Sequence, residues 1–378
     1  MKSVVIAGYA RSPFTFAKKG ALARVRPDEL CAQVITGLLE RVKIDPASIE
    51  DVIVGCAMPE GEQGLNVARL ISFLAHLPIT VAGTTVNRFC GSSMQSIHMA
   101  AGAIQLDAGE AFLCAGVESM TRVPMAGFNP MPHPGLAHDF PAAYMSMGQT
   151  AENVARKYQV TRAQQDTFSA LSQKKAAAAQ SAGKLRGEIV AIKGKAGTVE
   201  EDGCIRADTT PEILAGLQPA FDQSGTVTAG TSSPLTDGAA AVLVCTEDYA
   251  KRNKLEPLAR VKSIGVAGCA PDIMGIGPVA ASQKALKRAG LAIKDIDVIE
   301  LNEAFASQAI ACIRELGIDE AKVNLDGGAI ALGHPLGATG ARITGKAAQI
   351  MKREGKRYAL ATQCIGGGQG IATILESL

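Results

Sequence analysis

The chain has 378 residues, of which 47% are hydrophobic and 20% are charged, a composition typical of a globular protein with a large buried core. Its 38 Lys and Arg residues against 36 Asp and Glu give a formal net charge of +2. This balance excludes the basic excess of a protein that binds nucleic acid or a membrane surface through charge alone.

The nine cysteines are widely spaced and include no C-x-x-C pair. This spacing predicts reduced thiols, no metal site and a cytoplasmic location. The first residues run directly into a strand-like pattern, so we expect neither a targeting segment nor a membrane span.

Strand-like and helix-like segments alternate along the chain, and their order is repeated in its second half. Such a duplication predicts an α/β layered architecture in each half, with a ligand site where the halves meet. The matched stretches are 2–8 with 262–268, 29–43 and 49–54 with 279–289 and 296–300, and 111–116 with 358–363.

A different kind of segment, about 118–235, separates the two halves. Its part 120–147 holds five of the 11 methionines and five prolines. This composition fits an adaptable apolar cover over a ligand, and it fits an oligomer contact or ordinary loop packing equally well. Thr161 and Gln164 form a capping-box pattern that predicts a helix as far as Gly183, solvent-facing because it is rich in Lys and Ala.

Cys90 lies in the motif VNRFCGSSMQSI, directly before a helix-like run, 91–106, that carries no charged residue. A helix without a charged face is expected to be buried. At its N-terminus the helix dipole and free backbone N–H groups would favour a thiolate. The alternative for Cys90 is an inert buried thiol.

His334 lies among glycines in GGAIALGHPLGATGAR, also directly before a helix-like segment. An imidazole can take the proton of a nearby thiol, and the alternative is a histidine that only caps a turn. In the duplicated frame His334 corresponds to Cys90, so the two halves could bring both residues to one site.

Two further motifs carry candidate groups. Cys364 in QCIGGGQG supplies a second thiol and exposed backbone N–H groups, and Asn302 in LNEAFA supplies a neutral donor after a strand. The glycine run is not a dinucleotide loop, because only eight residues follow it.

In this order and spacing the four motifs resemble those of the thiolase family, and the resemblance covers essentially the whole chain. It implies two βαβαβαββ halves stacked as five layers, α-β-α-β-α. The first half would be 1–248, with the inserted loop domain at about 118–235, and the second half would be 258–378.

The resemblance also implies roles. Cys90 resembles the nucleophile that becomes acylated, His334 its base, and Cys364 the acid/base. Asn302 would hold a water in one oxyanion hole beside His334, and the N–H groups of Cys90 and Gly366 would form a second. Coenzyme A would be a substrate, with no cofactor required. The residues implied to contact CoA and the thioester are Met147, Phe221, Ala229, Ser233, Ala304 and Phe305.

Three positions depart from family patterns: Asp326 and Thr231 stand where Asn is usual, and Ser146 stands where the short-chain biosynthetic branch tends to have His. The residue Ser146, the short loop 120–147 and the stretch Pro134-Gly135-Leu136 are together most similar to the bacterial degradative 3-ketoacyl-CoA thiolases of fatty-acid oxidation. The resemblance further implies a homodimer or homotetramer, and it is compatible with a complex with other β-oxidation enzymes.

Three alternatives stay open at this point. The chain could be an acetoacetyl-CoA thiolase, with the same chemistry on the smallest substrate. It could be a decarboxylating condensing enzyme, although such enzymes have Cys-His-His or Cys-His-Asn sites, whereas this chain has NEAFA where such a His would stand and adds Cys364. It could also be a non-catalytic, thiolase-like protein that binds acyl-CoA or lipid.

Overall fold

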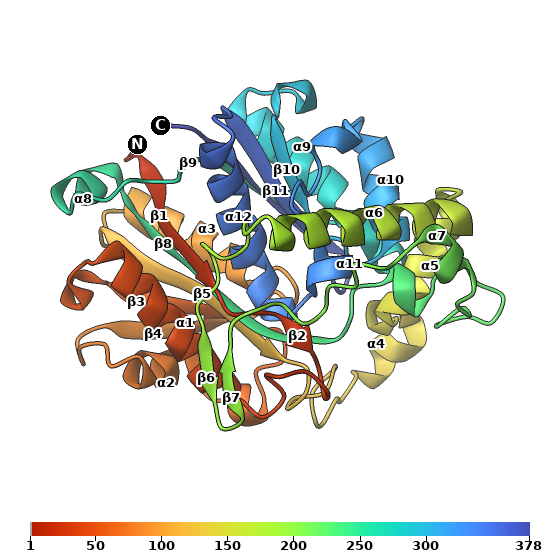
Figure 1. Ribbon diagram of the computed structural model, residues 1–378, viewed down its shortest axis with the longest axis horizontal. Helices are drawn as coiled ribbons and strands as arrows, with labels where there is room; N and C mark the ends of the chain where they lie inside the picture. The colour runs from red at the N-terminus through yellow and green to blue at the C-terminus, as the bar shows by residue number, and fades with distance from the viewer. Residues whose placement is uncertain (1) are drawn as a thin grey trace.

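Two sets of strands, one from each half of the sequence, join into one ten-stranded sheet in the computed structural model, which describes residues 2–378 (Figure 1). The sheet order is β10-β11-β12-β9-β1-β8-β5-β3-β4, and β2 pairs with β8. The sets meet at β1 and β9, which share only the pairs Val5 with Arg260 and Ile6 with Ala259. The strands are β1 (Val4–Arg11), β2 (Thr15–Phe16), β3 (Asp51–Gly55), β4 (Ala82–Val86), β5 (Ala111–Ser119), β8 (Thr236–Thr246), β9 (Ala259–Gly268), β10 (Val298–Leu301), β11 (Tyr358–Ile365) and β12 (Gln369–Glu376).

The predicted duplication is visible in the strand pairing. Outward from the junction, β1, β8, β5 and β3 follow one another in the first half, and β9, β12, β11 and β10 do so in the second. The outer pairs β3–β5 and β10–β11 are parallel, whereas β5–β8 and β11–β12 are antiparallel. Corresponding strands therefore make corresponding contacts, as expected of two related halves.

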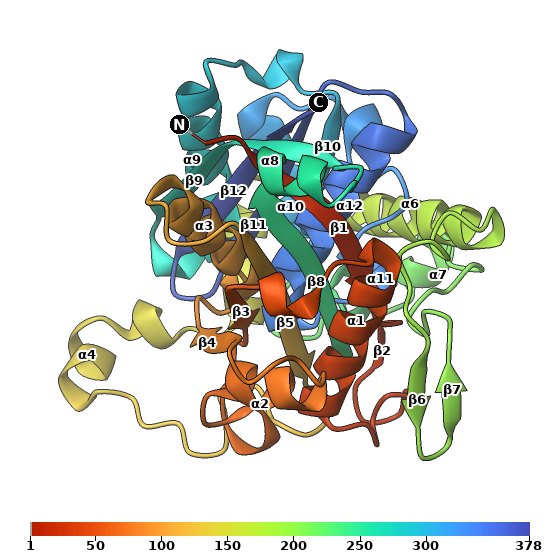
Figure 2. The same ribbon diagram turned by 90° about the vertical axis from the view of Figure 1, so that its left-hand side faces the viewer.

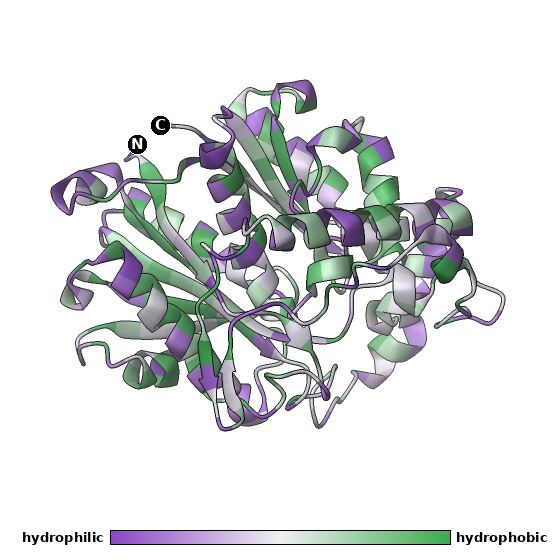
Figure 3. Cartoon of the chain, in the orientation of Figure 1, coloured by the Kyte–Doolittle hydropathy of each residue, from purple (hydrophilic) through white to green (hydrophobic). Residues whose placement is uncertain are grey.

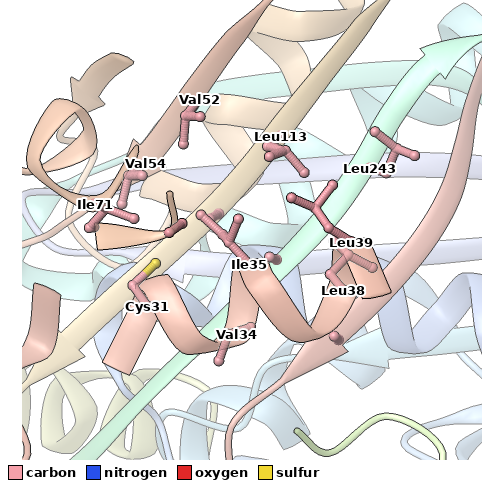
Figure 4. Close-up of a cluster of buried hydrophobic side chains, with 14 of the residues drawn as sticks. Cys31, Val34, Ile35, Leu38, Leu39, Val52, Val54, Ile71, Leu113 and Leu243 are labelled. Carbon is pink, nitrogen blue, oxygen red and sulfur yellow. The ribbon is translucent and has the colours of Figure 1, made fainter. Parts of the chain in front are cut away.

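Helices cover both outer faces of the sheet and fill the space between the halves. The alternating residues of β5 show the reason: Leu113 packs toward the outer helices, whereas Phe112 and Cys114 pack toward the central ones. Figure 4 shows the outer cluster of the first half, with Ile35 and Leu38 against the strands. The helices are α1 (Pro27–Val42) and α2 (Val67–Leu74) outside the first half, α9 (Gly277–Ala289) and α10 (Ala306–Leu316) outside the second, and α3 (Ser92–Gln105) and α12 (Thr339–Arg353) between them.

This arrangement confirms the predicted five layers, α-β-α-β-α. The helix predicted to be buried behind Cys90 is α3, which packs with α12 between the two sets of strands. Coloured by hydropathy, the strands between the helical layers are mostly apolar, and polar residues gather on the outer turns (Figure 3). Among residues 2–378, no helix combines the length and the apolar character needed to cross a membrane.

The segment between β5 and β8 forms no part of the main sheet. Its helices α5 and α6 pack against α10 of the second half, whereas Ile192 of β6 joins the outer core of the first half. The residues around α4 extend away from the body (Figure 2). The link between the halves contains α8 (Glu247–Arg252). The elements of the segment are α4 (Pro134–Asp139), α5 (Met147–Lys157), α6 (Arg162–Ser181), β6 (Ile192–Gly194), β7 (Gly197–Val199) and α7 (Pro211–Ala215).

Helix α6 begins with the predicted capping box, in which Thr161 and Gln164 each bond the backbone of the other. The prediction that this helix faces solvent is wrong for one side of it. Ala176 and Ala179 are buried against Ala331 and Leu332, the turn that precedes His334. A helix rich in Lys and Ala can still bury one face. Its Ala side chains pack closely against another backbone on that face, and its Lys side chains lie on the other faces.

Candidate active site

A cavity of about 200 Å³ lies where the two halves and the inserted segment meet, and both candidate cysteines and His334 line it. Cys90 comes from the first half, and His334 and Cys364 come from the second. Of the residues predicted to contact CoA, five line it: Met147, Phe221, Ser233, Ala304 and Phe305.

Cys90 lies two residues before the first residue of α3 and is 9% exposed. Burial raises the pKa of its thiol to about 11, although the backbone N–H groups of Gly366 and of Cys90 itself bond the sulfur and act in the opposite direction. The sequence predicted that the helix N-terminus would favour a thiolate. Desolvation outweighs that effect here, so the thiol is neutral at neutral pH and needs a base to ionise.

His334 can act as that base because its hydrogen bonds select one tautomer. Nδ1 lies 2.6 Å from the Thr339 hydroxyl oxygen, and that hydroxyl lies 3.1 Å from the carbonyl oxygen of Pro335. A carbonyl only accepts, so Thr339 donates its hydrogen to Pro335, and Nδ1–H donates to Thr339. Nε2 is then left without a proton.

Burial, followed by the charge of Arg342, lowers the pKa of His334 to about 3. The imidazole is therefore neutral at physiological pH. Its Nε2 lies 3.4 Å from the Asn302 side-chain nitrogen. Asn302 therefore lies beside His334, as the family resemblance implied. The Asn302 side-chain oxygen is buried and has no hydrogen-bond partner among residues 2–378.

Cys364 is the next-to-last residue of β11 and lines the cavity, and burial raises the pKa of its thiol well above the ordinary value. The preceding residue, Gln363, points to the opposite face of the strand, and its side-chain amide donates to the carbonyl oxygen of Cys90. One strand therefore carries the second thiol and also holds the backbone of the first.

The inserted segment supplies one wall of the cavity. The Phe221 ring packs on Gly148 at the start of α5 and meets Phe305 edge-on, with ring centroids 5.9 Å apart. Glu152 of α5 holds the loop that carries Phe221, because its carboxylate accepts the Val227 N–H at 2.8 Å and the Thr226 N–H at 3.0 Å. Ala229 is exposed on the same loop and lies outside the cavity lining.

Further hydrogen bonds join the halves around the site. The His334 N–H donates to the Thr236 hydroxyl at 3.1 Å, and the Ala341 N–H donates to the Ser93 hydroxyl at 2.8 Å. The first bond attaches the His334 turn to β8, and the second attaches α12, the helix after that turn, to α3, the helix after Cys90.

Asp326, which departs from the family pattern, is paired on two sides. Its carboxylate lies 2.8 Å from Lys346 and 2.7 Å from Arg353, and Lys346 continues to Glu188 at 2.9 Å. Burial opposes ionisation, but Arg353 and Lys346 hold the pKa of Asp326 below its usual value. The carboxylate of Asp326, in the place of the usual Asn amide, therefore leaves no unpaired charge beside the His334 turn.

Sequence reasoning missed several residues of the cavity and its support. Met120 and Met125 belong to the methionine-rich stretch, which was the only signal for them. Gln363 and Thr339 lie inside recognised motifs, but the patterns gave no indication of their side-chain contacts. The other missed lining residues are Ser146, Gly148, Ser232, Pro234, Leu235, Met274 and Leu336.

Comparison with known proteins gives consistent results over the whole chain. Residues 4–248 match the model of the thiolase N-terminal domain, and residues 255–377 match that of the thiolase C-terminal domain. The chain is 49% identical to a 3-ketoacyl-CoA thiolase of Bacillus subtilis (strain 168) over 389 aligned residues, covering 100% of both proteins. It is also 49% identical to one of Pseudoalteromonas translucida (strain TAC 125), covering 100% of this chain and 99% of that protein. The crystal structure of human mitochondrial 3-ketoacyl-CoA thiolase superposes with a TM-score of 0.92 at 38% identity, covering 100% of this chain and 99% of the other.

Proposed function

Because the chain belongs to the thiolase family, we propose that it cleaves 3-ketoacyl-CoA with CoA to acyl-CoA and acetyl-CoA, and catalyses the reverse Claisen condensation. The observation that carries this proposal is the meeting of Cys90, His334 and Cys364 at one cavity, although they lie far apart in the sequence. Two thiols and a neutral imidazole suit an acyl transfer through a covalent thioester.

In the first half-reaction, Nε2 of His334 takes the Cys90 proton, and the sulfur attacks the 3-keto carbon of the substrate. The bond between C2 and C3 breaks, the acyl group stays on Cys90, and Cys364 protonates the acetyl-CoA enolate. In the second, the CoA thiol gives its proton to the Cys364 thiolate, and the CoA sulfur attacks the thioester. Acyl-CoA leaves, and the protonated His334 returns its proton to the Cys90 sulfur.

Both steps pass through oxyanions that need fixed donors. We assign one oxyanion position to the Asn302 amide, through a water, together with His334. We assign the other to the N–H groups of Cys90 and Gly366, and these same groups bond the Cys90 sulfur in the free protein, which supports the assignment. Removing one such donor typically costs about 10²–10³ in kcat.

We propose that CoA enters along the loop that carries Phe221 and Ser233, and that the reaction needs no cofactor or metal. The apolar character of the lining, with Met120, Met125 and Leu235, supports 3-ketoacyl-CoA substrates longer than four carbons. The comparison of kcat/KM for acetoacetyl-CoA with that for longer 3-ketoacyl-CoA tests this choice. A clear preference for acetoacetyl-CoA would instead support the short-chain alternative.

We also propose a cytoplasmic homo-oligomer, a dimer or a tetramer, which is compatible with binding to other β-oxidation enzymes. Strand β4 forms one edge of the sheet, and apolar side chains near it are exposed. An open strand edge beside exposed apolar residues favours association with another subunit. These side chains are Leu65, Leu70, Phe73, Leu74 and Ile79.

The direct test is the covalent intermediate. After incubation with acetyl-CoA, mass spectrometry of the intact protein and its peptides should place one acetyl group on Cys90. Cys90→Ala should abolish both acetylation and thiolysis, while its thermal unfolding stays close to that of the wild type. Normal thiolysis by Cys90→Ala would refute the mechanism. A wild-type protein that binds acyl-CoA without becoming acylated would instead support the non-catalytic alternative.

A further inference from the structure

Four nitrogen donors, three from residues 57–63 and one from Gly337, converge on one buried carboxylate at the end of β5. Glu118 is 1% exposed. Its Oε2 accepts the Ala57 N–H at 2.8 Å and the Gly337 N–H at 2.9 Å. Its Oε1 accepts from the Gln63 amide at 2.8 Å and from the Met58 N–H at 3.2 Å, and the Cys56 thiol lies 3.8 Å away. Within residues 2–378 no Lys, Arg or His pairs with this carboxylate.

Three of these nitrogen donors belong to the first half, and the fourth belongs to the turn that carries His334. Gly337 lies three residues after His334 and two before Thr339, the residue that fixes the imidazole tautomer. A single atom, Oε2 of Glu118, therefore joins the loop after β3 to the His334 turn.

The turn also lies directly on the strand ends. A Cβ atom on Gly337 would come within 2.7 Å of the Val117 carbonyl oxygen and 2.8 Å of the Cys56 α-carbon, and one on Gly116 would collide with the Gly337 carbonyl. Only backbone fits between them, so the hydrogen bond from Gly337 sets where the turn lies.

We propose that Glu118 is a positioning residue that holds the His334 turn at the distance from Cys90 that proton transfer requires. The inference rests on the proposed function and adds to it a residue that touches neither substrate nor the reacting atoms.

The charge of Glu118 argues for a geometric role. After burial, its carboxylate is one of the groups that raise the pKa of the Cys90 thiol. It therefore works against the thiolate that the reaction needs, and electrostatics alone would not favour a carboxylate there. A carboxylate can accept all four donors, whereas an amide accepts only through its oxygen and would direct its own N–H groups at the others.

The test compares Glu118→Gln with a matched control, Asp237→Asn. Asp237 is also fully buried, and its partners lie within the first half: the Thr121 N–H at 3.0 Å, the Ser119 hydroxyl at 3.1 Å and the Thr121 hydroxyl at 2.5 Å. Rapid-quench measurement of Cys90 acylation should show a loss of about 10²-fold in Glu118→Gln, the size expected when a catalytic group is misplaced by about 1 Å. The KM for CoA should change little, because the CoA wall is untouched. Asp237→Asn should lower the unfolding temperature without this loss of acylation rate.

A second variant, Glu118→Asp, covers the case that Glu118→Gln does not fold. It keeps the charge but is one methylene too short to reach both Ala57 and Gly337, so acylation should again be slow. Alkylation of Cys90 by iodoacetamide separates the two effects. Its pH midpoint should fall in Glu118→Gln, where the charge is lost, and stay near that of the wild type in Glu118→Asp.

Acylation at the wild-type rate in either folded Glu118 variant would overturn the inference, as would an equal loss in Asp237→Asn. These results leave the thiolase proposal standing, because the wild-type protein still forms the acyl thioester. If the wild type itself is never acylated, the proposed function fails and the inference falls with it.

Discussion

At the scale of single residues, the resting site is electrically neutral. Burial raises the pKa of the Cys90 thiol to about 11 and lowers that of His334 to about 3, so neither group is charged at pH 7. In the proposed mechanism we expect the proton to move only when the substrate is in place and developing negative charge meets the oxyanion donors. A neutral pair also protects the thiol from alkylation and oxidation between turnovers, because the thiolate is the reactive form.

The two buried histidines predict how stability depends on pH. Burial lowers the pKa values of His98 and His334 from 6.5 to about 3. Between these values the unfolded chain binds more protons than the folded one, so the free energy of unfolding should fall as pH decreases from about 6.5 toward 3. Chemical denaturation of His98→Gln across this range should show a shallower pH dependence than the wild type. An unchanged slope would contradict the assignment of a neutral buried His98.

Thr339 provides a prediction about the tautomer of His334. Thr339→Val keeps the shape of the side chain but removes the acceptor of Nδ1–H, so Nε2 is no longer held free of the proton. We expect kcat to fall about 10–10²-fold, less than the roughly 10²–10⁴-fold that a general base contributes, because His334 itself is kept, with a smaller change in KM. Thr339→Ser keeps the hydroxyl and should retain most of the activity. Full activity in Thr339→Val with a loss in Thr339→Ser would instead show that packing of the methyl group matters and that the hydroxyl does not.

At the scale of elements, helix starts were easier to predict than helix faces. Thr161 with Gln164 marked the beginning of α6, because a capping box is a local pattern. Its buried side was not predictable, since that depends on the turn before His334, which lies far along the chain. In the same way, the glycines at 366–368 indicated exposed backbone, and the family resemblance singled out the N–H groups of Cys90 and Gly366, but no local pattern indicated that these groups bond the Cys90 sulfur in the free protein.

The start of α5 predicts a separation between CoA binding and chemistry. A Cβ atom at Gly148 would collide with the Phe221 ring, so Gly148→Ala should displace that ring from its contact with Phe305. The KM for CoA should rise several-fold, because the CoA wall moves while the two thiols stay in place. Acylation by a thioester of N-acetylcysteamine, which lacks most of the CoA arm, should keep its wild-type rate. A loss with both substrates would place the effect at the reacting groups.

At the scale of the whole molecule, buried charges connect the parts of the chain. Arg11 pairs with Glu188 at 2.7 Å and with Asp202 at 2.7 Å, and Glu188 continues through Lys346 to Asp326. The network joins the first strand, the inserted segment and the stretch before His334. Such a network fixes the relative position of the parts more than it adds stability, because desolvation offsets much of the attraction.

Asp326→Asn tests this network. It leaves Lys346 with one carboxylate partner, Glu188, and removes the buried partner of Arg353. Removing one member of a buried ion pair is expected to cost about 3–5 kcal/mol of unfolding free energy, measured by denaturant titration. A double variant, Asp326→Asn with Lys346→Met, should recover part of this loss. It removes the Lys346 ammonium, which Asp326→Asn leaves buried with only one of its two carboxylate partners. No recovery would show that Lys346 remains satisfied by Glu188 alone.

The sequence by itself indicated an α/β architecture in each half and the candidate reacting groups. Duplicated strand and helix patterns predicted the layers of each half, and four motifs, through their resemblance to one family, singled out Cys90, Asn302, His334 and Cys364, because these features depend on local spacing. Only the tertiary structure decided the protonation state of the site and the contacts that hold it, including those of Glu118, Gln363, Thr339 and the ion pairs of Asp326. Burial and hydrogen bonds between distant segments set these properties, and neither can be read from neighbours along the chain.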